Sequence, residues 1–141
     1  MALDAPTALL VVAAGHAGFQ LTVTTMVYPA LAATRPEDWS RMHDRHSRAI
    51  TPLVVLAYGG LVLTGTWTVV AAPLDAMLLV ALAAAAATIV VTGAFAAPLH
   101  GRLGAQGPRP ELLLRLLAVD RVRLVLALLT LLWAAGAAST T

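Results

Sequence analysis

The hydrophobic positions of the chain fall into long, nearly uninterrupted runs. Three runs are clear, at residues 7–33, 49–72 and 74–99, and a fourth at about 112–138 is interrupted by charges in its first half. A helix needs about 20 apolar residues to cross the hydrocarbon layer of a membrane, so each run is long enough. The alternation of polar and apolar residues that is typical of β-strands is absent, and an open sheet would leave unpaired backbone groups at its edges in lipid. The pattern predicts an all-α fold: an integral membrane antiparallel four-helix bundle in which residues 1–141 form one transmembrane domain.

The composition agrees with this pattern. Of the 141 residues, 60% are hydrophobic and 11% are charged, which leaves too little polar surface for a water-soluble domain of this size. The chain has no cysteine, which excludes a disulfide framework and a thiolate metal site. The first apolar run has no basic segment before it and is long enough to span, so we expect no cleavable signal.

The charges predict how the bundle sits in the membrane. There is no lysine, and the opposite side carries only Asp4 and Asp75. The arginines all lie between the first two runs, or between the third run and the start of the fourth: Arg35, Arg41, Arg45, Arg48, Arg102, Arg109, Arg115, Arg121 and Arg123. The positive-inside rule then places both arginine-rich segments in the cytoplasm and both termini on the outer side of the cell's inner (plasma) membrane. Arginines that line a membrane face contact lipid headgroups, so we expect no nucleic-acid partner.

Local signals predict where helices begin and bend. Thr34 followed by Glu37, with Pro36 between them, is a capping-box pattern that predicts the start of the second helix. Pro52 predicts a kink in that helix, because it cannot donate a backbone hydrogen bond. Pro110 predicts the start of the fourth helix, after a loop rich in glycine and proline.

An antiparallel bundle brings polar residues from all four helices to the cytoplasmic end. His43 and His46 are three residues apart and share a helix face, as do Asp120 and Arg123, which we expect to form an ion pair. The predicted cluster consists of Tyr28, His43, His46, His100, Asp120 and Arg123.

Three imidazoles and a carboxylate would suit a zinc, copper or iron ion, so His43, His46 and His100 are candidate metal ligands. Simpler explanations exist for each residue. His43 and His46 can be solvated residues of the membrane interface, as Trp39 beside them is expected to be. His100 can cap the end of its helix, and the ion pair can be purely structural.

A polar stripe also follows the first helix, where His16, Gln20, Thr24 and Tyr28 recur every four residues. His16 lies roughly 9 residues, or about 14 Å, from the outer end, and an ionisable residue at such depth suggests function. His16 and Gln20 are therefore candidate cofactor-binding residues, in a polar channel that could hold a quinone-like ring. The alternative is that His16 hydrogen-bonds to threonines of other helices: Thr64, Thr66 or Thr92.

Four segments carry a family resemblance: "GFQLTVTTMVYPAL" (18–31), "ITP" (50–52), "TGAFAAPLHGRL" (92–103) and "LLAVDRVRL" (116–124). With them the chain, from about residue 15 to 132, resembles small four-helix membrane proteins of actinobacteria and, more distantly, the anthrone oxygenase-like family of membrane proteins. The resemblance implies oxidation by dioxygen of an activated methylene group in a phenolic ring system.

Two motifs of that family have counterparts here. Where the family has a Pro-Leu-Asn-like motif at the end of the third span, this chain has Pro98, Leu99 and His100. Where it has an Asn-x-x-Arg-like motif in the fourth helix, this chain has Asp120 and Arg123. Arg123 matches, whereas His100 and Asp120 replace asparagines with groups better suited to metal binding or proton transfer.

Three functions remain open from the sequence. The first is a membrane-embedded oxidoreductase that acts on an apolar aromatic or quinone-like molecule, with His46, Tyr28, Asp120 and Arg123 as catalytic residues. The second is a non-catalytic membrane subunit or chaperone that docks a partner through its arginine-rich face. The third is a small transporter that forms a homo-oligomer and conducts along the His16 stripe. In all three the lipid bilayer is a partner.

Overall fold

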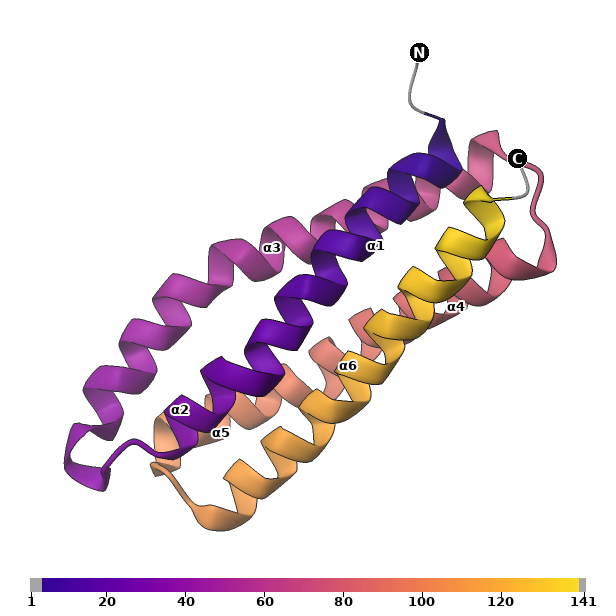
Figure 1. Cartoon of the computed structure of the whole chain (residues 1–141). Helices are drawn as coiled ribbons and strands as arrows, with labels where there is room; N and C mark the ends of the chain where they lie inside the picture. Colours follow the sequence, from indigo (N-terminus) through magenta and orange to yellow (C-terminus); the bar gives the residue numbers. More distant parts are fainter. Residues whose placement is uncertain (1–3, 140–141) are drawn as a thin grey trace.

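The computed structural model describes residues 4–139, and within this range the chain is helical, as the sequence predicts (Figure 1). Four long helical segments follow one another, and three of them contain a change of helix type. In chain order the elements are α1 (Ala5–Thr22), the π turn η1 (Val23–Val27), α2 (Tyr28–Ala32), the 3₁₀ turn η2 (Pro36–Asp38), α3 (Trp39–Ala71), α4 (Ala76–Val91), the π turn η3 (Thr92–Ala96), α5 (Ala97–Gln106) and α6 (Pro110–Ala138).

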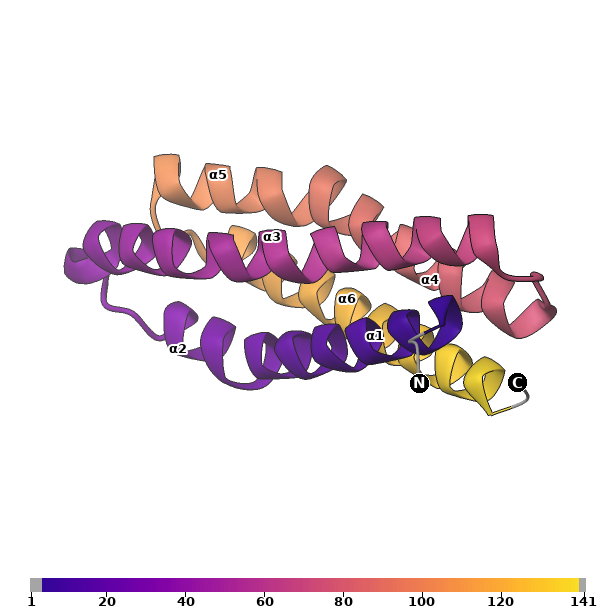
Figure 2. The same ribbon diagram turned by 90° about the horizontal axis from the view of Figure 1, so that it is seen from above.

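The four segments lie side by side along their length (Figures 1 and 2). One end, here called the termini end, holds both chain ends and the turn between α3 and α4. The other, the arginine-rich end, holds the connections at residues 33–35 and 107–109. Helix α6 packs against α1 and α4, and α3 packs chiefly against α1. Contacts between α3 and the α4–α5 segment are sparse, which leaves room for a pocket there.

The surface of the fold is apolar. Three segments, Ala5–Ala32, Pro36–Ala71 and Ala76–Gln106, are long and apolar enough to cross a membrane. Large apolar side chains on α3 point outward, among them Leu56 (74% exposed) and Val70 (81% exposed). Contiguous apolar surface of this extent is typical of a protein solvated by lipid, so the structure suggests a membrane protein.

Side-chain caps and prolines fix several helix ends. Asp4 Oδ1 accepts a hydrogen bond from the Thr7 amide at the start of α1, and Asp75 Oδ1 does the same for Leu78 in α4. Pro110 begins α6, as predicted. The predicted capping box is wrong: the Thr34 hydroxyl donates back to the Ala30 carbonyl, and Glu37 pairs with Arg35.

The two π turns explain how prolines are accommodated inside the apolar segments. Pro29 and Pro98 each lie two residues after a π turn, whereas α3 continues through Pro52 as an α-helix. A proline lacks an N–H and its ring collides with the carbonyl four residues earlier, which a π turn relieves. Each π turn also rotates the residues that follow it around the helix axis. It thereby sets the direction of Tyr28 in the first segment and His100 in the third.

Two buried apolar clusters form the core. The cluster at the termini end is built mainly from small and aliphatic side chains: Leu9, Ala13, Leu78, Ala81, Ala134 and Ala137. The cluster at the arginine-rich end has larger members, including two aromatic ones: Val23, Tyr28, Leu31, Trp39, Leu99, Leu103, Leu112 and Leu116. Polar side chains are buried beside this second cluster, and they form the candidate site.

Candidate functional site

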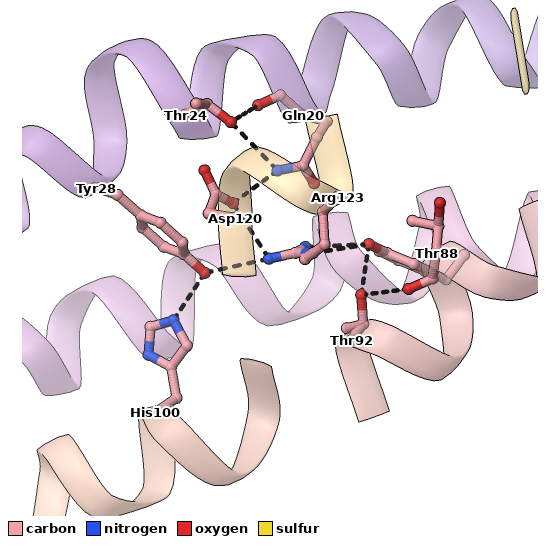
Figure 3. A network of polar contacts seen from close by, with 9 residues as sticks. Gln20, Thr24, Tyr28, Thr88, Thr92, His100, Asp120 and Arg123 are labelled. Atoms are coloured by element: carbon pink, nitrogen blue, oxygen red, sulfur yellow. Dashed lines mark hydrogen bonds and ion pairs between the residues drawn. The ribbon is translucent and has the colours of Figure 1, made fainter. Parts of the chain in front are cut away.

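Arg123, on α6, is the centre of a buried polar network (Figure 3). Its side chain is 3% exposed. Its Nη2 and Nε donate to the Tyr58 hydroxyl at 3.0 and 3.3 Å, and its Nη1 donates to the Tyr28 hydroxyl at 3.4 Å. Nη1 also lies 3.4 Å from Asp120 Oδ1, so the predicted ion pair is present. Arg123 thus joins α6 to the first and second helical segments.

Asp120 is held by the first helix. Gln20 Nε2 donates to Asp120 Oδ1 at 2.7 Å, and Gln20 also contacts the Thr24 hydroxyl at 3.4 Å. Asp120 Oδ2 and Gln20 Oε1 are buried and have no hydrogen-bond partner within residues 4–139. Buried polar atoms are normally paired, so these two oxygens mark a place where water or a ligand group can bind.

Tyr28 connects Arg123 to a histidine. The Tyr28 hydroxyl lies 2.8 Å from His100 Nε2. Because a guanidinium can only donate, the Tyr28 oxygen accepts from Arg123, and the donor in its hydrogen bond with His100 Nε2 depends on the tautomer of that histidine. A proton can therefore pass between the two side chains through one short hydrogen bond.

The three histidines of the predicted cluster do come together. The His100 ring lies 5.6 Å from that of His46 and 5.7 Å from that of His43, centroid to centroid. Trp39 stacks on His43 at 5.4 Å and donates its indole N–H to the Leu103 carbonyl at 3.1 Å. Trp39 is 3% exposed, so the expectation that it lies solvated at the interface is wrong: it anchors α3 to α5.

The metal-ligand prediction gains no support from this geometry. Residues 4–139 contain no group of three or more histidine or acidic side chains placed to share a metal ion. The His46 and His100 rings are stacked, with 21° between their planes, and His100 Nε2 is already bonded to Tyr28. Ring nitrogens bind metals in the plane of the ring, so stacked rings do not direct their lone pairs to one point.

His16 is 1% exposed and contacts the network through a ring. It meets the Tyr58 ring edge-on, with centroids 5.0 Å apart and planes at 76°. Neither ring nitrogen has a hydrogen-bond partner in the described part of the chain. The alternative that threonines bind His16 is not what the structure has, since Thr64 donates to Gly60 and Thr92 bonds to Thr88 and Tyr58. The contact with Tyr58 links His16 to Arg123.

Tyr58 is a member of the network that the sequence reasoning missed, and Thr92, another member, was considered only as a partner of His16. Tyr58 is buried, receives two hydrogen bonds from Arg123, and lies 2.8 Å from the Thr92 hydroxyl. A signal was available: the chain has two tyrosines, and Tyr58 is alone as a polar aromatic residue in the middle of an apolar run. Buried tyrosine hydroxyls need partners, and the buried arginine is the natural one.

A pocket of about 260 Å³ opens beside the network, between α3 and the first and third segments. Its walls are mostly apolar, and three residues of the network, Tyr28, His100 and Arg123, also line it; we call these three its polar floor. Val55, at its edge, is 66% exposed, so the pocket reaches the apolar outer surface of α3. His46 and Asp120, two of the predicted catalytic residues, do not line this pocket. We call it the site pocket.

The site pocket combines a fixed cation, a hydroxyl and an imidazole with apolar walls. Such an arrangement can hold an apolar ring and stabilise negative charge on an oxygen attached to it. It can also move a proton, because Tyr28 and His100 share a short hydrogen bond.

Comparison with known proteins adds no assignment. No protein-family model, no curated protein and no solved structure matches the chain. The resemblance to the anthrone oxygenase-like family therefore stays a prediction from the sequence motifs.

Proposed function

We propose that the chain is a membrane-embedded oxidoreductase that binds an apolar ring compound in the site pocket and oxidises it with dioxygen. Arg123 carries this proposal: it is a buried cation on the floor of an apolar pocket, bonded to a tyrosine that contacts a histidine. Ionisable side chains inside a membrane bundle are costly, and by default they indicate a functional site.

The pocket favours a flat, apolar substrate with one oxygen function. Phe19, Val23 and Val54 are among its walls, and they suit a fused ring. Its volume lies near the lower end of the range for small-molecule sites, which fits one compact molecule and not a long chain. Because the pocket reaches the lipid-facing surface at Val55, a substrate dissolved in the bilayer can enter without passing through water.

The polar floor supports a specific reaction, the oxidation of a methylene group activated by a neighbouring carbonyl. Arg123 stabilises the enolate oxygen, since a preorganised cation in a dry site interacts strongly with developing charge. Tyr28 and His100 take up the proton that leaves the carbon. The enolate then reacts with one dioxygen molecule: one oxygen atom becomes the new carbonyl, and the other leaves as water with the two hydrogens of the methylene.

No step of this proposal passes through a metal ion, because the stacked histidines do not offer a shared coordination point. The rings of His46 and His43 instead pack against the ring of His100, and neither residue lines the site pocket. Asp120 and Gln20 are positioning residues outside the lining of the site pocket: Asp120 pairs with the guanidinium of Arg123, and Gln20 holds Asp120.

The test uses anthrone, a three-ring ketone with an activated methylene, and the detergent-purified chain. We expect one dioxygen consumed per quinone formed, at a rate unchanged by a chelator. Arg123→Gln should lower kcat/KM by about 100-fold or more, by analogy with the loss of one oxyanion-stabilising donor. His100→Gln keeps a partner for Tyr28 but removes the base, and it should lower kcat more than it raises KM.

Arg121→Gln is the matched control, because it removes an exposed arginine two residues away. Circular dichroism checks that each variant folds. Binding of the ring without oxygen uptake would instead favour the non-catalytic subunit or chaperone. Absence of both binding and turnover, for anthrone and related ring ketones, would overturn the proposal.

We also propose that the arginine-rich end faces the cytoplasm and that the termini end faces outward in the plasma membrane. The uneven distribution of arginine supports this orientation. The chain has no cysteine, so single cysteines can report it directly. Pro73→Cys, in the α3–α4 turn, should react with an impermeant maleimide on intact cells, and Gln106→Cys, at the end of α5, should react only after lysis. The reverse pattern would invert the orientation.

A further inference from the structure

A second hollow of the molecule lies outside the site and is used by nothing described so far. It is a groove of about 450 Å³ between the α4–α5 segment and α6. It shares no lining residue with the site pocket: Phe95, Pro98 and Arg102 face the groove, whereas Ala97 and His100 face the pocket. The two hollows therefore lie on different faces of the third segment.

The groove is polar at one end and apolar along the rest. Arg102 lies near the end of α5 and Arg115 near the start of α6, so both guanidinium groups come from the arginine-rich end. Phe95, about two turns before Arg102, and Val119, one turn after Arg115, line the part farther from that end. Ala94 and Ala118 also line this part, and their short side chains leave it hollow.

The two arginines carry charge that the protein does not neutralise. Within residues 4–139, three other arginines form ion pairs with acidic residues, but Arg102 and Arg115 form neither an ion pair nor a hydrogen bond. Glu111 lies one turn before Arg115 and is not paired with it either. Phe95, in the apolar part, is 55% exposed. Among the described residues, the charged half of the groove is therefore unneutralised and the apolar half is exposed.

We propose that this groove binds an anionic phospholipid, with the phosphate between Arg102 and Arg115 and an acyl chain along Phe95, Pro98 and Val119. Charge and shape together argue for a lipid: guanidinium groups bind phosphate through several hydrogen bonds, and basic clefts between membrane helices bind acidic headgroups. A free phosphate would use only the arginine end and would leave the apolar part empty. The proposal does not rest on the oxidoreductase function.

The test is a lipid titration of the full chain in detergent, followed by native mass spectrometry. The probes are phosphatidylglycerol, phosphatidylcholine with the same acyl chains, and inorganic phosphate. We expect the wild-type chain to retain phosphatidylglycerol preferentially. The Arg102→Gln/Arg115→Gln variant should lose affinity by roughly 5-fold per arginine, the value of one basic residue near an acidic lipid surface.

Two further variants separate the groove from general charge. Arg48→Gln/Arg121→Gln removes the same charge from exposed positions outside the groove, and it should bind like the wild type. Ala118→Leu fills the apolar part, keeps both arginines, and should weaken binding of long-chain lipid. The proposal would be overturned if both double arginine variants lost the same affinity for phosphatidylglycerol. It would also be overturned if the wild type showed no preference for the acidic headgroup, or if inorganic phosphate displaced the lipid at comparable concentration.

Discussion

The two ends of the bundle solve the problem of burying side chains in opposite ways. At the termini end, helices meet through alanine and leucine, and the buried hydroxyls of Thr68 and Thr130 donate to carbonyls of their own helices. From the arginine-rich end to the middle of the bundle, an ion pair is buried, and several polar atoms have no partner among the described residues: both ring nitrogens of His16, Gln20 Oε1, His43 Nε2, His46 Nε2 and Asp120 Oδ2.

This difference indicates that side-chain burial stabilises the arginine-rich half less than the termini half. An unpaired buried polar atom costs about 1–3 kcal/mol, and a buried ion pair often contributes less than apolar residues of the same size would. Among the described residues, the core at the termini end has neither feature, so helix packing as such does not require them. We infer that the arginine-rich half carries the function and the termini half holds the helices in place.

The largest expected effect comes from breaking the ion pair. Asp120→Leu leaves the buried Arg123 without its carboxylate and should lower the free energy of unfolding by about 3–5 kcal/mol. Asp120→Leu combined with Arg123→Met should recover most of that loss, because neither charge is then buried alone. Denaturation in detergent, followed by circular dichroism, measures both. A loss below about 1 kcal/mol in the single variant would mean that Asp120 does not compensate Arg123.

A smaller effect is expected from crowding the termini end. Ala81 is fully buried in that core, and Ala81→Leu should lower the free energy of unfolding by about 1–3 kcal/mol. Ala83→Leu, at an exposed position two residues along the same helix, is the control and should change little. Ring binding at the site pocket should survive in the folded fraction of both variants. If Ala81→Leu abolished ring binding while the chain stayed folded, the two ends would not be independent.

A pair of glycines in α5 tests how closely the histidines are packed. A Cβ at Gly104 would lie 3.2 Å from His43 Cε1, whereas a Cβ at Gly101 would meet nothing within 4 Å. Gly101→Ala should therefore stabilise the helix by up to about 1 kcal/mol, from helix propensity alone. Gly104→Ala should gain less or lose stability, since the imidazole must shift against Trp39. Equal stabilisation of both variants would show that the His43 ring moves freely.

The sequence was sufficient to predict the helical segments, the residues of the cluster and the Asp120–Arg123 ion pair, but not the other partners of Arg123. The apolar runs and the arginine distribution follow from single-residue properties, and i, i+3 spacing put Asp120 beside Arg123. The partners of Arg123 depend on how three helices rotate against one another. Tyr58, whose position in an apolar run gave no periodic signal, was missed for this reason.

The π turns were not predicted either, although their cause is visible in the sequence. Pro29 and Pro98 both interrupt an apolar run, yet only Pro52 was expected to disturb its helix. In the structure α3 continues through Pro52 as an α-helix, and the π turns precede Pro29 and Pro98. Whether a proline bends a helix or induces a π turn depends on the neighbouring helices that contact it, which the sequence alone does not reveal.

The smallest expected effect separates a structural hydroxyl from a functional one. Thr130 is fully buried and donates to the Leu126 carbonyl of its own helix at 2.9 Å. Thr130→Val has nearly the same shape, and the carbonyl keeps its backbone donor, so the free energy of unfolding should change by less than about 0.6 kcal/mol. Thr92→Val, in contrast, removes the hydroxyl beside Tyr58 and should cost about 1–2 kcal/mol. The same denaturation experiment compares the two variants. If Thr130→Val lowered the free energy of unfolding as much as Thr92→Val, the two hydroxyls would contribute equally to stability. That result would contradict the division of the bundle into a structural half and a functional half.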